Sequence, residues 1–219
     1  MPTAAVDRGP SQSRLFTGAD SAVVEHCKGL FQREYFRRGS QLFTQGDVAH
    51  AIFFISSGFV RLSYLLSDGR EVSVALIGAG EVIGEEALVG ANQCSLTATV
   101  VEDCTAFRAR GYRLAKLFET NATLAMNLAR QISLRRDEIG LALEDVAQGR
   151  VRDRILRALR RLATQRGERS NAGQCLAVRL THHEIATFVG STRETVTSAI
   201  AELIQAGAIS RTVGSFTIR

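Results

Sequence analysis

Arginine, glutamate and threonine side chains gather between residues 181 and 198, in a pattern suited to contacting a polyanion. The stretch from Ser191 to Ser198 reads Ser-Thr-Arg-Glu-Thr-Val-Thr-Ser. If a helix begins here, Arg193 can donate two hydrogen bonds to guanine O6 and N7, and Glu194 can accept one from cytosine N4. The hydroxyls of Thr192 and Thr195, with the free backbone amides of a helix start, suit phosphate groups. These residues therefore predict contacts with double-stranded DNA.

Glu194 also allows a purely structural interpretation, because Ser191 and Glu194 stand at the spacing of a helix capping box. The charge distribution favours nucleic acid over this alternative. Residues 1–108 contain 9 Lys plus Arg against 12 Asp plus Glu, or −3, and residues 109–219 contain 18 against 10, or +8, which together give the formal charge of +5. A basic half joined to a slightly acidic half predicts two domains, of which the basic one faces a polyanion.

Two short helices joined by a glycine turn would position these side chains. Residues 181–184, Thr-His-His-Glu, have the T-x-x-E spacing of a capping box. They predict a helix that ends at Gly190, where the turn needs a residue without a Cβ atom. A second helix starts at residues 191–192, and its expected buried face is Val196, Ile200 and Leu203. This is the helix-turn-helix pattern, in which the start of the second helix reaches base edges.

Further elements flank this motif on both sides. Residues 151–162 predict an amphipathic helix with an Arg-rich outer face, and a polar loop is expected at residues 167–173. After Gly207, residues 208–211 and 215–218 predict a hairpin, which would form the wing of a winged helix.

The N-terminal half is expected to be an antiparallel β jelly-roll barrel, because turn signals recur every 8–12 residues between Phe31 and Arg108. Asp68-Gly69 predicts a tight hairpin turn, since this pair tolerates positive φ. Residues 56–58, Ser-Ser-Gly, are interpreted as the end of a strand. The expected strands are residues 36–43, 51–55, 60–66, 72–76, 96–101 and 104–108.

One long amphipathic helix is expected between the two halves, with Thr120 or Asn121 as its cap. It would run roughly 25 residues, or about 37 Å. A second copy of the chain is the simplest partner for its apolar stripe, which predicts a coiled-coil-like homodimer; packing against its own barrel is the alternative. Gly140 would mark a close crossing or a flexible point. The stripe is Leu117, Leu124, Leu128, Ile132, Ile139, Leu143 and Val146.

The periodicity ends at residues 148–150, so three parts are expected. Residues 1–120 would form an effector-sensing β-barrel domain, residues 121–147 the dimerisation helix, and residues 148–219 a winged helix-turn-helix domain that binds DNA.

Composition excludes several classes of protein. A hydrophobic content of 45% argues against disorder, and no stretch approaches the ~18 apolar residues of a membrane span. The N-terminal residues 1–14 lack an apolar core, so a cleaved signal peptide is not expected. The four Cys contain no C-x-x-C spacing, which fits a reducing cytoplasm. No phosphate loop, Ser–His–Asp order or metal-spaced cluster indicates an enzyme.

These residues resemble the cyclic AMP receptor protein/FNR family of bacterial transcription regulators from about Phe16 onward. Residues 80–88, Gly-Glu-Val-Ile-Gly-Glu-Glu-Ala-Leu, look like the family's effector-pocket cassette, and residues 185–200 look like its DNA-reading motif. The resemblance implies a homodimer whose recognition helices enter successive major grooves, about 34 Å apart. It also implies a phosphate contact for His182, which with Thr181 begins the preceding helix, and recruitment of RNA polymerase by an activator, with residues 166–171 as the candidate contact.

The candidate effector pocket departs from the family pattern. Gly84 and Glu85 match the ribose-binding part and Ser95 the phosphate-binding Ser, but Cys94 stands at the position of the phosphate-binding Arg. Without a cation, a cyclic phosphate loses a charge-assisted hydrogen bond, worth about 1.5–3 kcal/mol. Cyclic AMP is therefore not the expected effector, no cofactor is assigned, and the effector stays unknown. Cys94 is either a redox sensor or a small apolar filler.

The resemblance also bears on the operator and on the cofactors of some relatives. Relatives commonly carry Arg at the position of Ser198, which predicts a TGTGA…TCACA-like operator relaxed at one base pair. Cys27 alone does not support the iron–sulfur cluster of some relatives, and His26 and His50 are the candidate ligands for the haem of others.

The expected function is that of a sequence-specific regulator that binds DNA as a homodimer in the cytoplasm. The barrel would set the spacing of the recognition helices, either through a ligand with unequal affinity for two states or in a DNA-binding state that needs no ligand. A sensing module that acts on a protein partner is the alternative from another class. A steep salt dependence of duplex binding would separate the two.

Overall fold

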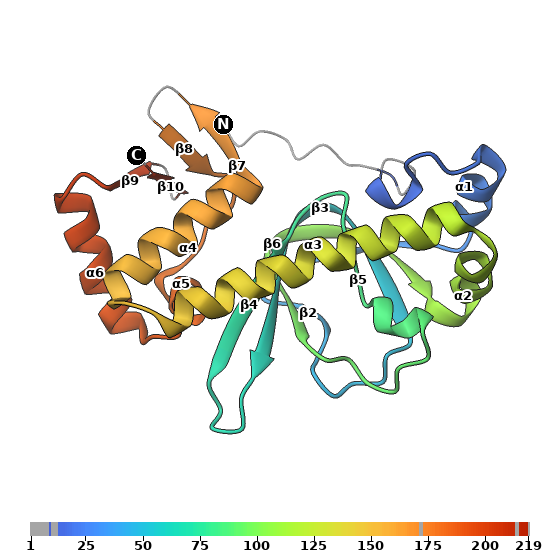
Figure 1. Cartoon of the computed structure of the whole chain (residues 1–219), viewed down its shortest axis with the longest axis horizontal. Helices are drawn as coiled ribbons and strands as arrows, with labels where there is room; N and C mark the ends of the chain where they lie inside the picture. Colours follow the sequence, from blue (N-terminus) through green and yellow to red (C-terminus); the bar gives the residue numbers. More distant parts are fainter. Residues whose placement is uncertain (1–8, 10–12, 171–172, 213–214, 219) are drawn as a thin grey trace. The chain divides into compact units, whose positions relative to one another are not determined.

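A computed structural model describes residues 9, 13–170, 173–212 and 215–218 of the 219-residue chain (Figure 1). The described residues divide into two compact units. The first combines the chain up to Leu62 with Ile77–Arg136. The second combines Ser63–Leu76 with the chain from Asp137 onward.

An antiparallel sheet of six strands dominates the N-terminal half, in the order β1-β6-β3-β4, with β2 paired to β6 and β5 to β3. This jelly-roll-like sheet confirms the predicted fold class, although it is not a closed barrel. Short helices accompany it: η2 (Arg14–Phe16), α1 (Ser21–Lys28) and η3 (Glu85–Leu88). The strands are β1 (Gln32–Phe36), β2 (Gln41–Phe43), β3 (Ala51–Leu65), β4 (Glu71–Ile77), β5 (Val82–Ile83) and β6 (Thr97–Arg110).

Two predicted strand ends are wrong, because β3 and β6 each run through them. Gly58 adopts a φ of +79° within β3, and a Cβ atom there would lie 2.2 Å from the Asp103 carbonyl oxygen of β6. Glycine here permits close strand contact instead of ending the strand. In β6, the Asp103 carboxylate accepts hydrogen bonds from the Tyr35 hydroxyl at 2.6 Å and the Arg38 amide at 2.8 Å. These contacts with a distant segment hold a polar residue inside the strand.

The core of the first unit takes up part of the predicted apolar stripe. Leu117 lies in a separate helix, α2 (Gly111–Thr120), and only later residues of the stripe lie in α3 (Ala122–Ala147). The predicted cap is confirmed, since Asn121 Oδ1 accepts a hydrogen bond from the Leu124 amide at 3.0 Å. Leu124 is buried in the core, and Leu117 and Leu128 pack against it. The first part of the stripe therefore packs on its own unit, which was the alternative to a partner chain.

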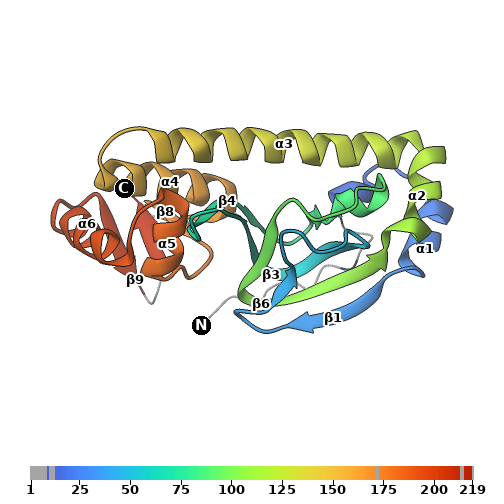
Figure 2. The same cartoon turned by 90° about the horizontal axis from the view of Figure 1, so that it is seen from below.

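Helices α4, α5 and α6 form the bulk of the second unit beside a small sheet, as Figure 2 shows. The sheet has the order β7-β8-β10-β9. The helices α4 (Val151–Arg166), α5 (His182–Val189) and α6 (Arg193–Gln205) bury Ile155, Phe188 and Ile200 with Phe216 of the sheet. The strands are β7 (Gly167–Ser170), β8 (Gly173–Leu176), β9 (Ile209–Thr212) and β10 (Ser215–Ile218).

The predicted hairpin near the C-terminus is confirmed by β9 and β10, although residues 213–214 lie outside the described part. The predicted polar loop at 167–173 is wrong, because β7 pairs with β8 in the register Glu168↔Cys175. Backbone pairing supplies this structure, so the composition did not reveal it. None of the described helices has the length and apolarity that a membrane span requires.

Candidate functional site

The turn before α6 is built as the sequence predicts. Thr181 and Glu184 form the capping box of α5: the Glu184 amide donates to Thr181 Oγ1 at 3.1 Å, and the Thr181 amide donates to Glu184 Oε2 at 2.6 Å. Gly190 ends the helix in the left-handed region, at φ +58° and ψ +51°. The amide of Ser191 then donates to the Ala186 carbonyl at 3.0 Å, which closes the turn. The turn directs the chain into α6 and exposes the start of that helix.

The start of α6 is capped one residue later than the capping-box alternative required. Thr192, not Ser191, is the cap residue, and its Oγ1 accepts from the Thr195 amide at 3.2 Å. The Glu194 carboxylate is therefore not used in the cap. Arg193 and Glu194 are both exposed, and no ion pair joins either of them to another described residue. The charges of Arg193 and Glu194 are therefore accessible at the start of α6, where such side chains can contact the edges of bases.

The hydroxyl groups along α6 are already hydrogen-bonded within the chain. Thr192 Oγ1 and Thr195 Oγ1 lie 3.0 Å apart, so one of the two hydroxyls donates to the other and only the accepting one keeps its proton for a phosphate. The Ser198 hydroxyl donates to the Glu194 carbonyl at 3.3 Å. The Ser198 hydroxyl therefore donates its hydrogen bond within α6 and has no proton left to donate to a base.

The His182 side chain links α5 to α6. Its Nδ1 lies 2.9 Å from Thr197 Oγ1, and its Nε2 is buried without a hydrogen-bond partner in the described part of the chain. Burial lowers the pKa of His182, and the positive charges of Arg211 and Arg193 lower it further. The side chains of Arg193 on α6 and Arg211 on β9 are therefore near enough to His182 on α5 to act on its charge. Thr197 and Arg211 were not singled out from the sequence, because their contact with His182 depends on how these elements pack.

The candidate effector pocket is organised around an ion pair. Gly84 holds a φ of +79°, and a Cβ atom there would lie 2.5 Å from the Ala51 carbonyl oxygen. The following residue, Glu85, accepts a hydrogen bond from Arg135 of α3 at 2.8 Å between Oε1 and Nη1. Arg135 also donates to the Val82 carbonyl, and its side chain is largely buried. Sequence reasoning missed Arg135, which lies 50 residues from Glu85 along the chain.

Cys94 and Ser95 lie in a more acidic environment than the resemblance implies. The Cys94 residue is 6% exposed, and its backbone bonds to Gly46 and Asp47. Burial raises the pKa of the Cys94 thiol, and the carboxylates of Glu86 and Asp47 raise it further. The neutral thiol is therefore favoured, which supports the filler interpretation over the redox sensor. The Ser95 amide donates to Glu86 Oε1 at 3.4 Å, so a carboxylate, not a cation, stands beside this segment.

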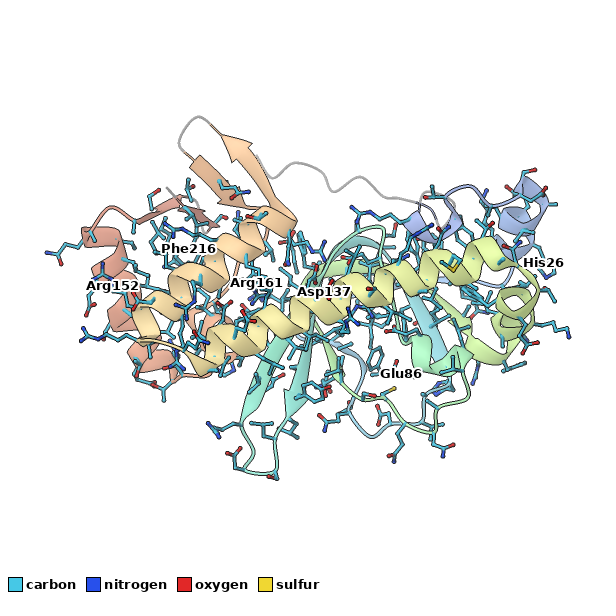
Figure 3. The ribbon with its side chains drawn as sticks, viewed as in Figure 1. His26, Glu86, Asp137, Arg152, Arg161 and Phe216 are labelled. Atoms are coloured by element: carbon cyan, nitrogen blue, oxygen red, sulfur yellow. The ribbon has the colours of Figure 1, made fainter. Side chains whose placement is uncertain are left out.

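The other candidate ligands are placed separately. His50 uses both ring nitrogens within the chain, at 2.8 Å from the Val48 carbonyl and 3.0 Å from Arg108 Nη2. His26 lies on α1, apart from Glu86 of η3 (Figure 3). Cys27 is buried in the core. Within the described ranges, no three His, Cys, Asp or Glu residues gather to hold a metal ion.

The candidate polymerase contact at 166–171 is only partly described. The Arg166 side chain points inward, because its Nε donates to the Leu76 carbonyl at 2.9 Å and its Nη2 lies 3.7 Å from Glu138 Oε1. Arg166 is therefore not an exposed contact, which corrects that part of the prediction. Asn171 lies outside the described residues.

Comparisons with known proteins match both halves of the chain. Residues 33–121 match the family model of the cyclic nucleotide-binding domain, and residues 153–219 match that of the Crp-like helix-turn-helix domain. The Cyclic AMP receptor protein of Thermus thermophilus is 31% identical over 207 residues, which cover 94% of this chain and 93% of that protein. The CRP-like cAMP-activated global transcriptional regulator of Mycobacterium tuberculosis is 25% identical over 197 residues, or 90% and 88%.

A solved structure gives the same fold. The c-di-GMP responsive global regulator CLP of Xanthomonas campestris superposes with a TM-score of 0.76 at 22% identity, covering 91% of this chain and 99% of that one. These relatives are transcription regulators, not enzymes.

Proposed function

Because the chain belongs to the cyclic AMP receptor protein/FNR family of transcription regulators, we propose that it binds a two-fold-symmetric operator as a homodimer. In this proposal, residues 1–120 sense an effector, residues 121–147 dimerise and residues 148–219 bind DNA in the cytoplasm. The observation that carries it is the start of α6, where Thr192 caps the helix and leaves Arg193 and Glu194 exposed. Arg193 would read guanine and Glu194 cytosine in each half-site.

Phosphate contacts would come from residues around that helix start. Thr192 and Thr195 offer hydroxyls, and Thr181 and His182 lie at the start of α5. Neutralising several phosphates supplies affinity without sequence preference, so these contacts would orient the helix while Arg193 and Glu194 discriminate. DNA-bound dimers would then act on RNA polymerase.

An exposed stripe on α3 supports dimerisation. Seven exposed residues recur at alternating steps of three and four, the spacing at which two helices pair in a coiled coil. Gly140 lies in this stripe, and apart from its neighbours and the nearby backbone of α3, no described atom lies within 4 Å of where its Cβ would be. A close crossing with a second helix is therefore possible there, as the sequence suggested. The stripe is Met126, Ala129, Ser133, Arg136, Gly140, Leu143 and Ala147.

We also propose that cyclic AMP is not the effector. The Cys94 segment offers the carboxylates of Asp47 and Glu86 where a cyclic phosphate would need a cation. Glu85, which would hold the ribose, is already paired with Arg135. The named relatives respond to different small molecules, so the family as such does not select one effector.

The test is selection of bound sequences from random duplexes with the full-length protein. We expect a palindromic site with one G·C pair read by Arg193 and Glu194 in each half, resembling TGTGA…TCACA and relaxed at one position. Arg193→Ala should lose discrimination at that pair by about 1–3 kcal/mol per half-site. A selected site without symmetry-related G·C pairs, or an Arg193→Ala variant with unchanged preference, would contradict the proposal.

A further inference from the structure

A buried pair of hydroxyl groups connects the large sheet to the helix-turn-helix. Ser73 lies on β4 and Thr187 on α5, and their side-chain oxygens are 2.6 Å apart although the residues are 114 positions apart in the sequence. Ser73 is fully buried and Thr187 is 6% exposed. Both residues belong to the second unit, which includes the Ser63–Leu76 part of the β3–β4 hairpin. Within this unit, β4 therefore contacts α5 through Ser73.

The direction of the hydrogen bonds can be assigned. Thr187 Oγ1 lies 2.7 Å from the Glu184 carbonyl oxygen, which can only accept, so Thr187 donates its proton there. Ser73 must then donate to Thr187. The chain of bonds ends at Glu184, whose carboxylate closes the capping box with Thr181. A strand of the sheet is thereby linked to the first turn of α5.

A second contact holds the same hairpin. Arg166 at the end of α4 donates from Nε to the Leu76 carbonyl of β4 at 2.9 Å, and its Nη2 lies 3.7 Å from Glu138 Oε1 on α3. The hairpin is thus attached to α5 through Ser73 and to α4 through Leu76. A shift of β4 would act on both helices that support α6.

We infer that Ser73 is a positioning residue for DNA reading. Its hydrogen bond to Thr187 keeps the first turn of α5 in the orientation from which Thr181 and His182 meet phosphate, and it transmits the position of β4 to the recognition helix. The inference rests on the proposed DNA-binding function. It gives the part of the β3–β4 hairpin that belongs to the second unit a role in orienting α5.

The experiment compares full-length Ser73→Ala, Thr187→Val and the double variant on the operator selected by the wild-type protein. Fluorescence anisotropy gives affinity for this operator and for a scrambled duplex, and thermal unfolding checks the fold. Two variants serve as controls. Ser63→Ala removes another fully buried serine of the same hairpin, one that donates to Glu71 at 2.5 Å and not to α5. Thr187→Ser retains the hydroxyl.

We expect Ser73→Ala and Thr187→Val each to weaken operator binding by about fivefold, because each removes the Ser73–Thr187 bond; Thr187→Val also removes the bond to the Glu184 carbonyl. The double variant should bind no more weakly than Thr187→Val, because that single variant has already lost the bond to Ser73. Ser63→Ala and Thr187→Ser should stay within about twofold of the wild type. Amide exchange at residues 184–185 should accelerate in Ser73→Ala but not in Ser63→Ala.

Two results would overturn the positioning role and leave the proposed function intact. One is an operator affinity of Ser73→Ala equal to that of Ser63→Ala. The other is a loss of affinity in the double variant that equals the product of the losses in the two single variants. Failure of the wild-type protein to bind any duplex would overturn the proposed function itself, and the first measurement shows this before any variant is made.

Discussion

The Ser198 hydroxyl is turned back onto the Glu194 carbonyl, so at this residue the recognition helix gives up a contact that longer side chains can make. A guanidinium at the same exposed position would extend beyond the helix surface toward the bases. This residue-scale feature is the physical basis of the expected relaxed position in each half-site.

We predict that Ser198→Arg tightens operator binding and sharpens the preference at one further base pair. A bidentate contact to guanine is worth about 1–3 kcal/mol, or roughly 5- to 150-fold in affinity. Competition binding with duplexes that vary one base pair at a time measures both effects. Ala201→Arg, an exposed position farther along α6, is the control for added charge. An equal gain from both variants would assign the effect to charge alone.

We also predict that His182 makes DNA binding dependent on pH. In the free protein its pKa is lowered, first by burial and then by Arg211 and Arg193, so the ring is neutral at pH 7. A neighbouring DNA phosphate favours the charged form and raises the pKa in the complex. Binding therefore takes up protons, and affinity should increase as pH falls from 7.5 to 5.5, by about three- to tenfold per protomer.

Anisotropy at constant ionic strength measures this dependence. His182→Gln keeps a side chain that can bond Thr197 but does not titrate, so its affinity should be flat over the same range. His183→Gln should retain the wild-type slope. A wild-type affinity that does not change between pH 6 and 8 would rule out the role of His182.

At the scale of the element, two faces of α3 differ in what they contact. Leu124 packs into the core of the first unit, and Arg135 reaches Glu85 from the same side of the helix. The exposed stripe with Gly140 and Leu143 lies on another side. In the proposed homodimer, α3 would therefore contact the candidate effector pocket through Arg135 and the second copy through the exposed stripe.

We predict that Leu143→Glu prevents dimerisation. Leu143 is 55% exposed in the single chain, and burying it against a second copy would contribute about 1.5–3 kcal/mol per protomer. A carboxylate in the stripe would also face its own symmetry mate. Leu134→Glu is the matched control, because Leu134 is 57% exposed on the same helix but lies outside the stripe. Sedimentation velocity should show monomers for the first variant and dimers for the second; the reverse result would place the interface elsewhere.

At the scale of the whole molecule, the proposed choice of effector depends on the charges around the candidate pocket. Cys94 is buried beside carboxylates, and Arg135 forms an ion pair with Glu85. The Ser73–Thr187 bond lies within the second unit, so the proposal for Ser73 does not depend on which ligand the candidate pocket binds.

We predict that cyclic AMP up to millimolar concentration shifts neither the melting temperature nor the operator affinity of the wild-type protein. Cys94→Arg should gain measurable binding by isothermal titration calorimetry, because a charge-assisted hydrogen bond adds about 1.5–3 kcal/mol, or roughly 10- to 150-fold. Cys94→Ser, which adds no charge, should not. Micromolar binding by the wild type would show that another cation replaces the missing one.

The sequence by itself determined the helix-turn-helix, the wing and the long helix, because their signals are local. The Thr181–Glu184 capping box, the left-handed Gly190 and the Asn121 cap each act within four residues of the chain. The presence of an antiparallel sheet was equally predictable from the recurring turns. Its strand ends were not, since Gly58 and Asp103 look like strand ends until β3 and β6 are paired.

Only the tertiary structure decided which distant groups meet. Glu85 with Arg135, His182 with Thr197 and Ser73 with Thr187 are joined across 50, 15 and 114 residues. The tertiary structure also showed that Leu124 and Leu128 of the apolar stripe on α3 belong to the core of their own unit and that the cap of α6 is Thr192. Such contacts depend on the packing of whole elements against one another, and no pattern of neighbouring residue types specifies that packing.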